Sequence, residues 1–214
     1  MEPLRCLLLL SALLATLLSV SASPSPSASR SHPDVSFIRS NCRCTQYPAL
    51  CERSLSGFAG TIRHSRRQLA HAALAVSLDR ARSASTFVGR LAASMGGSAK
   101  RGFRSREAGA VRDCIENVAD SVDRLRRSAA ELGRMGRARS PGFAWHLSNV
   151  QTWVSAALTD ETTCLDGFSG HGVDPVLRAA IRRRILGVAQ VTSNALALIN
   201  RIGVRHRGGT GGTL

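Results

Sequence analysis

The carboxylates between residues 111 and 125 (VRDCIENVADSVDRL) are the side chains in this sequence best placed to do chemistry. If the segment is a helix, four of them project within about 80° of one another, opposite an apolar stripe. They are Asp113, Glu116, Asp120 and Asp123, with Asn117 at their edge. Neighbouring carboxylates can act as a general acid and a base, but only where a pocket raises one pKa. On the exposed, convex face of a helix the pattern favours binding over catalysis.

A second polar face is predicted between residues 150 and 168 (VQTWVSAALTDETTCLDGF). Its members are Thr159, Thr163 and Asp166, with Asp160 beside them. Glu161 interrupts the apolar stripe of the same segment and projects toward the core. It therefore predicts either a local irregularity in the helix or a carboxyl group that is satisfied internally.

The rest of the chain contains no catalytic or metal-binding pattern. Its histidines are scattered, with no His-x-x-x-His or Glu-His pairing: His32, His64, His71, His146, His171 and His206. It contains no Gly-x-Ser-x-Gly elbow and no glycine loop of the kind that cradles phosphate. We therefore expect no catalytic residues, no metal and no cofactor.

The net charge of +15 comes almost wholly from arginine, because Lys100 is the only lysine. Such a charge indicates an anionic environment, whether nucleic acid, an anionic membrane or an acidic polysaccharide. The alternative is that the arginines only solvate the surfaces of helices. No helix-turn-helix, ribonucleoprotein or zinc-finger motif accompanies the charge, so nucleic acid is not expected as a partner.

The N-terminus has the pattern of a signal peptide over residues 1–22. Arg5 precedes an apolar run from Cys6 to Val20, and Ala22 marks a small-residue cleavage site. The run is shorter than the ~20 residues of a membrane span. We therefore expect a secreted, extracellular protein that begins near Ser23, without membrane attachment after cleavage.

Cleavage of this segment removes Cys6 and leaves an odd number of cysteines: Cys42, Cys44, Cys51, Cys114 and Cys164. At least one is then unpaired or shared with another chain. Cys114 and Cys164 lie on the apolar stripes of the two segments described above. If these segments are neighbouring antiparallel helices, a bridge between them would hold both polar faces in fixed relation.

The mature chain is expected to be all-α. The predicted parts are a flexible Ser/Pro-rich leader over 23–34, a short helical hairpin over 35–58, a four-helix bundle over 60–203 and a disordered tail over 204–214. The hairpin is broken at Tyr47-Pro48, because the residue before a proline avoids helical angles. Thr45 could cap the second piece of the hairpin, with Pro48 near its first turn.

Four longer segments have apolar residues at helical spacing. They run from Gly60 to about Ser94, Ser105 to Leu132, Phe143 to Phe168 and Asp174 to Ile202. Asp174 is a predicted N-cap, followed by a proline at the first helical position. Because the connections between the segments are short, we expect an up-down-up-down bundle.

Four motifs together resemble the plant invertase and pectin methylesterase inhibitor family, over about residues 35–203. They are FIRSNC…TQYPALC at 37–51, VRDCIENVADSVDRL at 111–125, NVQTWVSAALTDETTCLDGF at 149–168 and VTSNALALI at 191–199. The wording ALTDETTCLDGF is similar to the pectin methylesterase inhibitor branch. The family fold is a four-helix bundle preceded by a helical hairpin, in agreement with the periodicity.

The resemblance implies the disulfides Cys42–Cys51 and Cys114–Cys164, and leaves Cys44, which departs from the four-cysteine pattern of the family, as a free thiol. It also implies a protein that is not an enzyme but binds one-to-one over the active-site cleft of pectin methylesterase. The positions that match the family's contact faces are Glu116, Asn117, Asp120, Asp123, Thr163 and Asp166. All six belong to the polar faces found by helical projection.

Two alternatives remain open. The same fold serves inhibitors of acid invertase, from the cell wall or the vacuole. The protein could also be a basic wall protein that holds anionic pectin without inhibiting any enzyme. Pectin binding and inhibition are compatible, because basic charge would concentrate an inhibitor where its target works.

Overall fold

A computed structural model describes residues 33–96, 105–138, 140–170 and 173–202, which form helices and the turns between them. The predicted signal peptide, most of the predicted leader and the tail lie outside the described residues. Helix α2 (Pro33–Cys42) begins inside the predicted leader, earlier than the expected start of structure at Val35. Proline is favourable at the first turn of a helix, and Asp34 in that turn complements the helix dipole.

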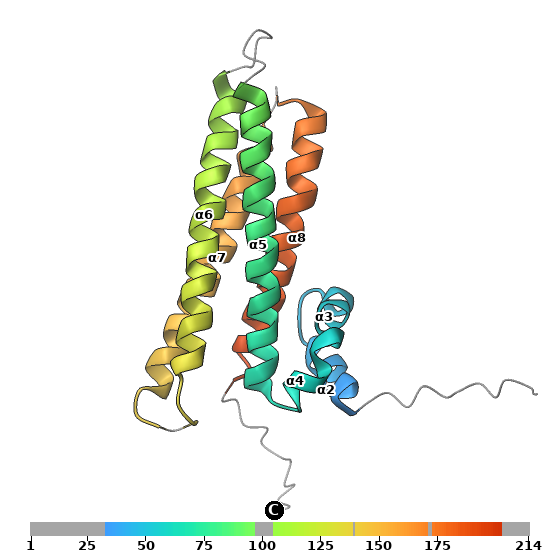
Figure 1. Cartoon of the computed structure of the whole chain (residues 1–214), viewed down its shortest axis with the longest axis vertical. Coiled ribbons are helices and arrows are strands. Elements are labelled where there is room, and N and C mark those ends of the chain that lie inside the picture. Colours follow the sequence, from blue (N-terminus) through green and yellow to red (C-terminus); the bar gives the residue numbers. More distant parts are fainter. Residues whose placement is uncertain (1–32, 97–104, 139, 171–172, 203–214) are drawn as a thin grey trace, which may run out of the picture. The chain divides into compact units, whose positions relative to one another are not determined.

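Four long helices form the bundle, as predicted (Figure 1). They are α5 (Arg66–Gly96), α6 (Ser105–Arg134), α7 (Phe143–Asp166) and α8 (Pro175–Ile199). Each packs against its neighbours in sequence, and α8 returns to pack against α5. The pair α6–α7 and the pair α5–α8 therefore form opposite sides of the bundle. None of the helices in the described part of the chain has both the length and the apolar content that a membrane span requires.

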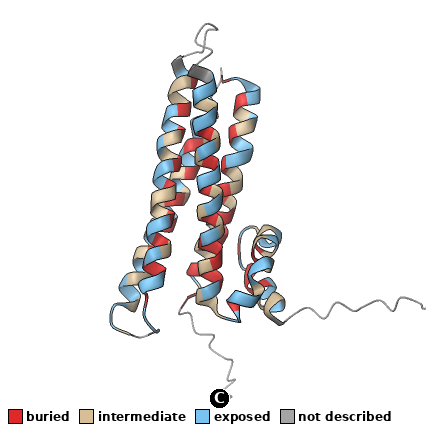
Figure 2. Ribbon diagram, viewed as in Figure 1, coloured by how far each residue is buried: buried red, intermediate tan, exposed pale blue. Residues whose placement is uncertain are grey.

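The core is built from the apolar stripes read in the sequence, and the buried residues line the inner faces of the helices in Figure 2. Each helix contributes side chains with no exposed surface, for example Leu74, Leu125, Val154 and Ile185. Burial of one such side chain stabilises the fold by roughly 1.5–3 kcal/mol. The bundle is thus held mainly by aliphatic packing, as expected for a chain with few aromatic residues.

The first bundle helix begins later than predicted. A short helix, α4 (Ala59–Ile62), occupies the start of the segment expected from Gly60 onward. It ends because Arg63 and His64 take positive φ values of 44° and 59°, which interrupt the helical path before α5. The N-cap predicted for α8 is confirmed, since Asp174 Oδ1 accepts a hydrogen bond from the backbone N–H of Leu177 (2.8 Å).

The N-terminal hairpin consists of α2 and α3 (Pro48–Leu55), and a short 3₁₀ turn, η1 (Ser56–Phe58), leads on to α4. A disulfide joins Cys42 at the end of α2 to Cys51 in α3, with 5.6 Å between the Cα atoms. Cys44, in the turn between the two helices, is a free and exposed cysteine. The bridge pins both helices beside the break at Pro48 that the sequence predicted.

Asn194 of α8 connects the hairpin to the bundle. Its Oδ1 accepts from the backbone N–H of Tyr47, and its Nδ2 donates to the carbonyl of the same residue, both at 3.0 Å. Next to it, Ser193 Oγ donates to Gln46 Oε1 (2.9 Å). Because Asn194 is buried, these bonds satisfy polar groups that water cannot reach. The turn before Pro48 is therefore held at a defined place on α8.

Candidate functional site

A disulfide between Cys114 and Cys164 fixes the register of α6 against α7. The Cα atoms of the two cysteines are 4.4 Å apart, and both side chains are buried. In an antiparallel pair, residues at equal separations from this bridge lie at similar heights. Asn117, three residues after Cys114, therefore lies level with Glu161, and Thr163, one residue before Cys164, lies two residues, or ~3 Å, along the helix axis from that level. The bridge thus holds the two helices that carry the predicted polar faces in a fixed register.

The α6–α7 polar face comprises the six contact residues predicted from the sequence: Glu116, Asn117, Asp120, Asp123, Thr163 and Asp166. Glu116 and Asp120 are exposed on α6. Within the described part of the chain, neither carboxylate takes part in a hydrogen bond or an ion pair. Both carboxylates are therefore available as hydrogen-bond acceptors for another molecule.

Asp123 differs from the other carboxylates because its own helix neutralises it. Arg126 Nη2 lies 2.6 Å from its Oδ1, and Arg127 Nε lies 2.6 Å from its Oδ2. The hydrogen bond from Arg126 holds the pKa of Asp123 below its usual range, and Arg127 adds to the effect. Projection of the acidic residues alone missed these arginines, although their spacing of three and four residues is that of helical ion pairs. A partner that meets Asp123 would meet a charge cluster rather than a lone carboxylate.

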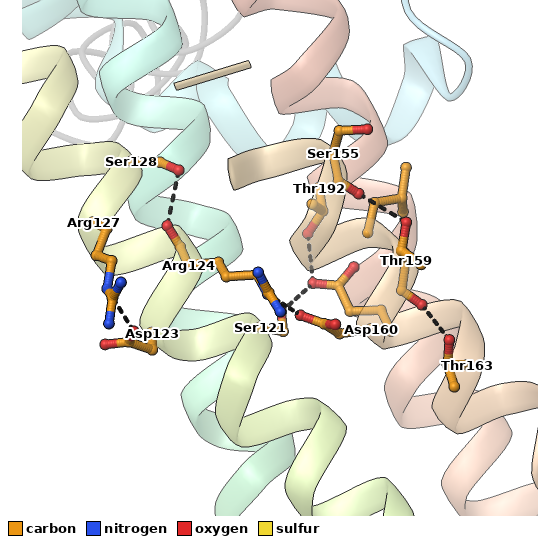
Figure 3. A network of polar contacts seen from close by, with 12 residues as sticks. Ser121, Asp123, Arg124, Arg127, Ser128, Ser155, Thr159, Asp160, Thr163 and Thr192 are labelled. Carbon is orange, nitrogen blue, oxygen red and sulfur yellow. Dashed lines mark hydrogen bonds and ion pairs between the residues drawn. The ribbon is translucent and has the colours of Figure 1, made fainter. Parts of the chain in front are cut away.

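An ion pair between α6 and α7 borders the face. Arg124 Nε donates to Asp160 Oδ2 at 2.7 Å, and Figure 3 shows the guanidinium reaching across to α7. Burial raises the pKa of Asp160, while Arg124 opposes the shift. The pair adds a polar link to the covalent one, and it occupies Asp160, which the sequence placed at the edge of the face. Arg124 had no predicted role, because its partner lies on another helix.

Asn117 and Thr163 are each hydrogen-bonded to their own helix. Asn117 Nδ2 donates to the carbonyl of Asp113, and Thr163 Oγ1 donates to the carbonyl of Thr159, both at 2.8 Å. Their donors are thereby engaged, whereas the amide Oδ1 and the hydroxyl lone pairs can still accept. Together with the carboxylates of Glu116 and Asp120, they give the face several open acceptors, while the donors of Arg126 and Arg127 lie at Asp123.

Glu161 points into the core, as projection predicted, and its carboxyl group is satisfied internally at one oxygen. Its Oε1 accepts from Ser121 Oγ on α6 (2.7 Å) and from Thr192 Oγ1 on α8 (3.0 Å). Its Oε2 is buried and has no hydrogen-bond partner. Burial raises the pKa of Glu161 to about 7. With 1% of its surface exposed, the group faces no substrate and belongs to the packing of the bundle.

The described residues contain no group of three or more histidine, cysteine or acidic side chains arranged to hold a metal ion. The acidic residues of the α6–α7 polar face lie on the outer surface of a helix. Among the described carboxyl groups, the one with a strongly raised pKa, Glu161, is enclosed in the core. The geometry therefore offers a surface for another macromolecule rather than a cleft for a small substrate.

The model of the family described as "Plant invertase/pectin methylesterase inhibitor" matches residues 36–198, which run from within α2 to the last turn of α8. The chain belongs to this family. Pectinesterase inhibitor 9 of Arabidopsis thaliana is 50% identical over 192 residues, 88% of this chain and 91% of the relative. A 21 kDa protein of Daucus carota is 44% identical over 200 residues, 94% of this chain and 96% of that protein.

The fold also agrees with a solved member of the family. The crystal structure of a mutant form of a pectin methylesterase inhibitor from Arabidopsis matches with a TM-score of 0.57 and 20% identity. The match covers 78% of this chain and 95% of that chain. It supports the hairpin-plus-bundle architecture.

Proposed function

We propose that this protein is a secreted inhibitor of pectin methylesterase. It binds the enzyme one-to-one and covers the active-site cleft with the α6–α7 polar face. The observation that carries the proposal is the position of this face in a chain of the inhibitor family. The Cys114–Cys164 bridge holds the two helices of the face in fixed register, and Glu116, Asp120, Asn117 and Thr163 keep open acceptors.

The chemistry of the face suits the cleft of an enzyme that acts on pectin. Such a cleft accommodates a polymer of acidic sugars and their esters, so it must offer donors to carboxylate and ester oxygens. Glu116, Asp120 and the open acceptors of Asn117 and Thr163 would take those donors. The protein would then imitate the acidic chain without containing a bond that the enzyme can hydrolyse.

Inhibition would follow from occlusion. The face stands on two long helices joined by a disulfide and by the Arg124–Asp160 ion pair, so little conformational freedom is lost when it binds. A convex, rigid surface fits a concave cleft and excludes the substrate. No chemical step on the inhibitor is needed.

Titration of the purified mature protein against a pectin methylesterase and an acid invertase tests the proposal. We expect the esterase activity to fall linearly and to end at one inhibitor per enzyme, while the invertase activity is unchanged. Loss of invertase activity alone would instead assign the other function covered by the family description, inhibition of acid invertase.

A second candidate is a wall protein that is retained on anionic pectin and inhibits nothing. The net charge of +15 favours such retention. Steep salt-dependent retention on pectin, together with full activity of both enzymes in the titration, would support this candidate in place of inhibition.

A further inference from the structure

Charge is distributed unevenly between the two sides of the bundle. Helices α5 and α8 together carry nine arginines and a single acidic residue, Asp79. Helices α6 and α7 carry six arginines and nine acidic residues. Since α5–α8 and α6–α7 are opposite sides of the bundle, the basic side faces away from the α6–α7 polar face.

A groove of about 420 Å³ runs between α5 and α8 on the basic side. It is lined by Asp79, Arg80 and Ser83 of α5 and by Arg183, Arg184, Gly187 and Val188 of α8. Gly187 lines the groove close to Arg80, since a Cβ atom there would lie 3.9 Å from Arg80 Nη1, in ordinary van der Waals contact. The guanidinium of Arg184 lies over the ring of Phe87, 5.0 Å from its centroid, which fixes one of the charges beside the groove.

Asp79 also lines this groove, but within the described ranges of the chain it forms no ion pair with the groove arginines. Among the described residues, none of Arg80, Arg183 and Arg184 forms an ion pair with a carboxylate. This contrasts with Arg124, Arg126 and Arg127 on the other side, each of which does. The guanidinium groups of the α5–α8 groove are therefore available to an external anion.

The groove geometry points to a ligand with several carboxylates. Arginine binds a carboxylate through two parallel hydrogen bonds. One exposed pair of this kind contributes a factor of about five or less to a binding constant, so a single uronic acid would be held weakly. A polymer that meets several arginines at once gains from their effective concentration. Both the open shape of the groove and its charge suit an extended chain.

We propose that the α5–α8 groove binds de-esterified polygalacturonate, through Arg80, Arg183 and Arg184. The choice of this polymer rests on the proposed function, because hydrolysis of pectin methyl esters produces carboxylates. The inhibitor would then be held on the product of its target enzyme, while its α6–α7 polar face stays free for the enzyme.

The test measures binding of a de-esterified oligogalacturonate, and of its fully methyl-esterified form, by calorimetry at low and moderate salt. We expect the mature protein to bind only the de-esterified form, more weakly at higher salt. The variant R80Q/R183Q/R184Q should lose affinity by about tenfold or more. The control R43Q/R53Q/R112Q removes the same charge from exposed arginines outside the groove and should change affinity by about twofold at most.

A further variant separates the shape of the groove from its charge. Gly187→Leu keeps every arginine, adds an apolar side chain at a residue that lines the groove and replaces a helical glycine with a better helix former. We expect it to weaken binding of the oligogalacturonate. Equal losses in the groove and control triple variants, unchanged binding by Gly187→Leu, or tighter binding of a sulfated glycan than of oligogalacturonate would each overturn the assignment.

The oligogalacturonate binding measurement does not depend on whether the protein inhibits an enzyme. R80Q/R183Q/R184Q should still inhibit pectin methylesterase on a soluble substrate, because its α6–α7 polar face is intact. If no enzyme were inhibited, oligogalacturonate binding could still be measured. Failure of the groove proposal and failure of the inhibitor proposal are therefore distinguishable.

Discussion

Glu161 Oε1 accepts a hydrogen bond from Ser121 Oγ across the α6–α7 interface, at 2.7 Å in a region closed to solvent. Thr192 completes the contact from α8, so one buried carboxyl group joins three of the four bundle helices. The bridge from Cys114 to Cys164 lies nearby, three residues along α7 from Glu161. The interface that supports the α6–α7 polar face thus contains both a covalent link and a titratable group.

Because the carboxyl group of Glu161 is buried, we expect the free energy of unfolding to fall as the pH rises. The pKa of Glu161 is raised from 4.5 to about 7 in the folded protein, so between these values the native state keeps a proton that the unfolded chain releases. The free energy of unfolding should therefore fall by about 3 kcal/mol at most across this pH range. Urea unfolding at pH 5 and at pH 7.5 measures it.

Glu161→Gln isolates the contribution of this residue. The amide does not titrate, so the free energy of unfolding of the variant should fall less between the two pH values. Its absolute stability is not the readout, since the buried amide also leaves a polar group unsatisfied, at a cost of about 1–3 kcal/mol at every pH. All other titrating groups are common to both proteins. Parallel pH profiles for the two proteins would contradict the assignment.

If the α6–α7 polar face contacts the enzyme, a large side chain at its centre should block inhibition. Asn117→Trp and Thr163→Trp place large side chains on two positions near the disulfide, one on each helix. Each should weaken inhibition of pectin methylesterase by roughly 30-fold or more, as at an interface hot spot. Inhibition constants measure the effect, and far-UV circular dichroism checks that helicity is retained.

Thr86→Trp is the matched control for this surface. Thr86 is exposed on α5, and its hydroxyl donates to the carbonyl of Arg82 four residues earlier, as that of Thr163 does to Thr159. The substitution should leave the inhibition constant unchanged. If Thr86→Trp and Thr163→Trp were equally harmful, or equally harmless, the enzyme would not be meeting α6 and α7 as proposed.

The two disulfides should contribute unequally to stability. In the loop-closure model, the Cys114–Cys164 bridge, with a sequence separation of 50, stabilises by about 4 kcal/mol. The Cys42–Cys51 bridge, with a separation of 9, stabilises by about 2.6 kcal/mol. Paired alanine substitutions should reproduce this order in guanidinium unfolding. A Cys44→Ser background removes the exposed free thiol and so prevents exchange. A larger loss from the hairpin bridge would show that native-state contacts, not loop length, decide the difference.

Asn194 should determine whether the hairpin stays docked on the bundle. Asn194→Asp loses the donor to the Tyr47 carbonyl and places a carboxylate beside it. We expect local opening of the hairpin to become easier by about 1–3 kcal/mol, seen as faster hydrogen exchange of the α3 amides. Asn200→Asp is the control, because the exposed Asn200 side chain acts as an acceptor from Gln151, a role that a carboxylate can take over. Exchange rates in α3 that are the same in both variants would contradict this role of Asn194.

The sequence by itself determined the helices and their inner faces. Apolar spacing placed Val118 and Val154 in the core. It also predicted that Glu161 points toward the core, although a carboxylate prefers solvent. The N-cap at Asp174 could also be predicted from the sequence, because a cap involves only residues a few positions apart. Family resemblance supplied the cysteine pairs. All of these features depend on short-range periodicity or on motifs.

Only the tertiary structure decided what the polar residues meet. The partners of Glu161 are on two other helices, and Arg124 is paired with a residue 36 positions away. The separation of an acidic side from a basic groove likewise arises because α6 pairs with α7 and α8 returns to α5. Helical projection describes one helix at a time, whereas charge on a bundle depends on which helices become neighbours and in what register.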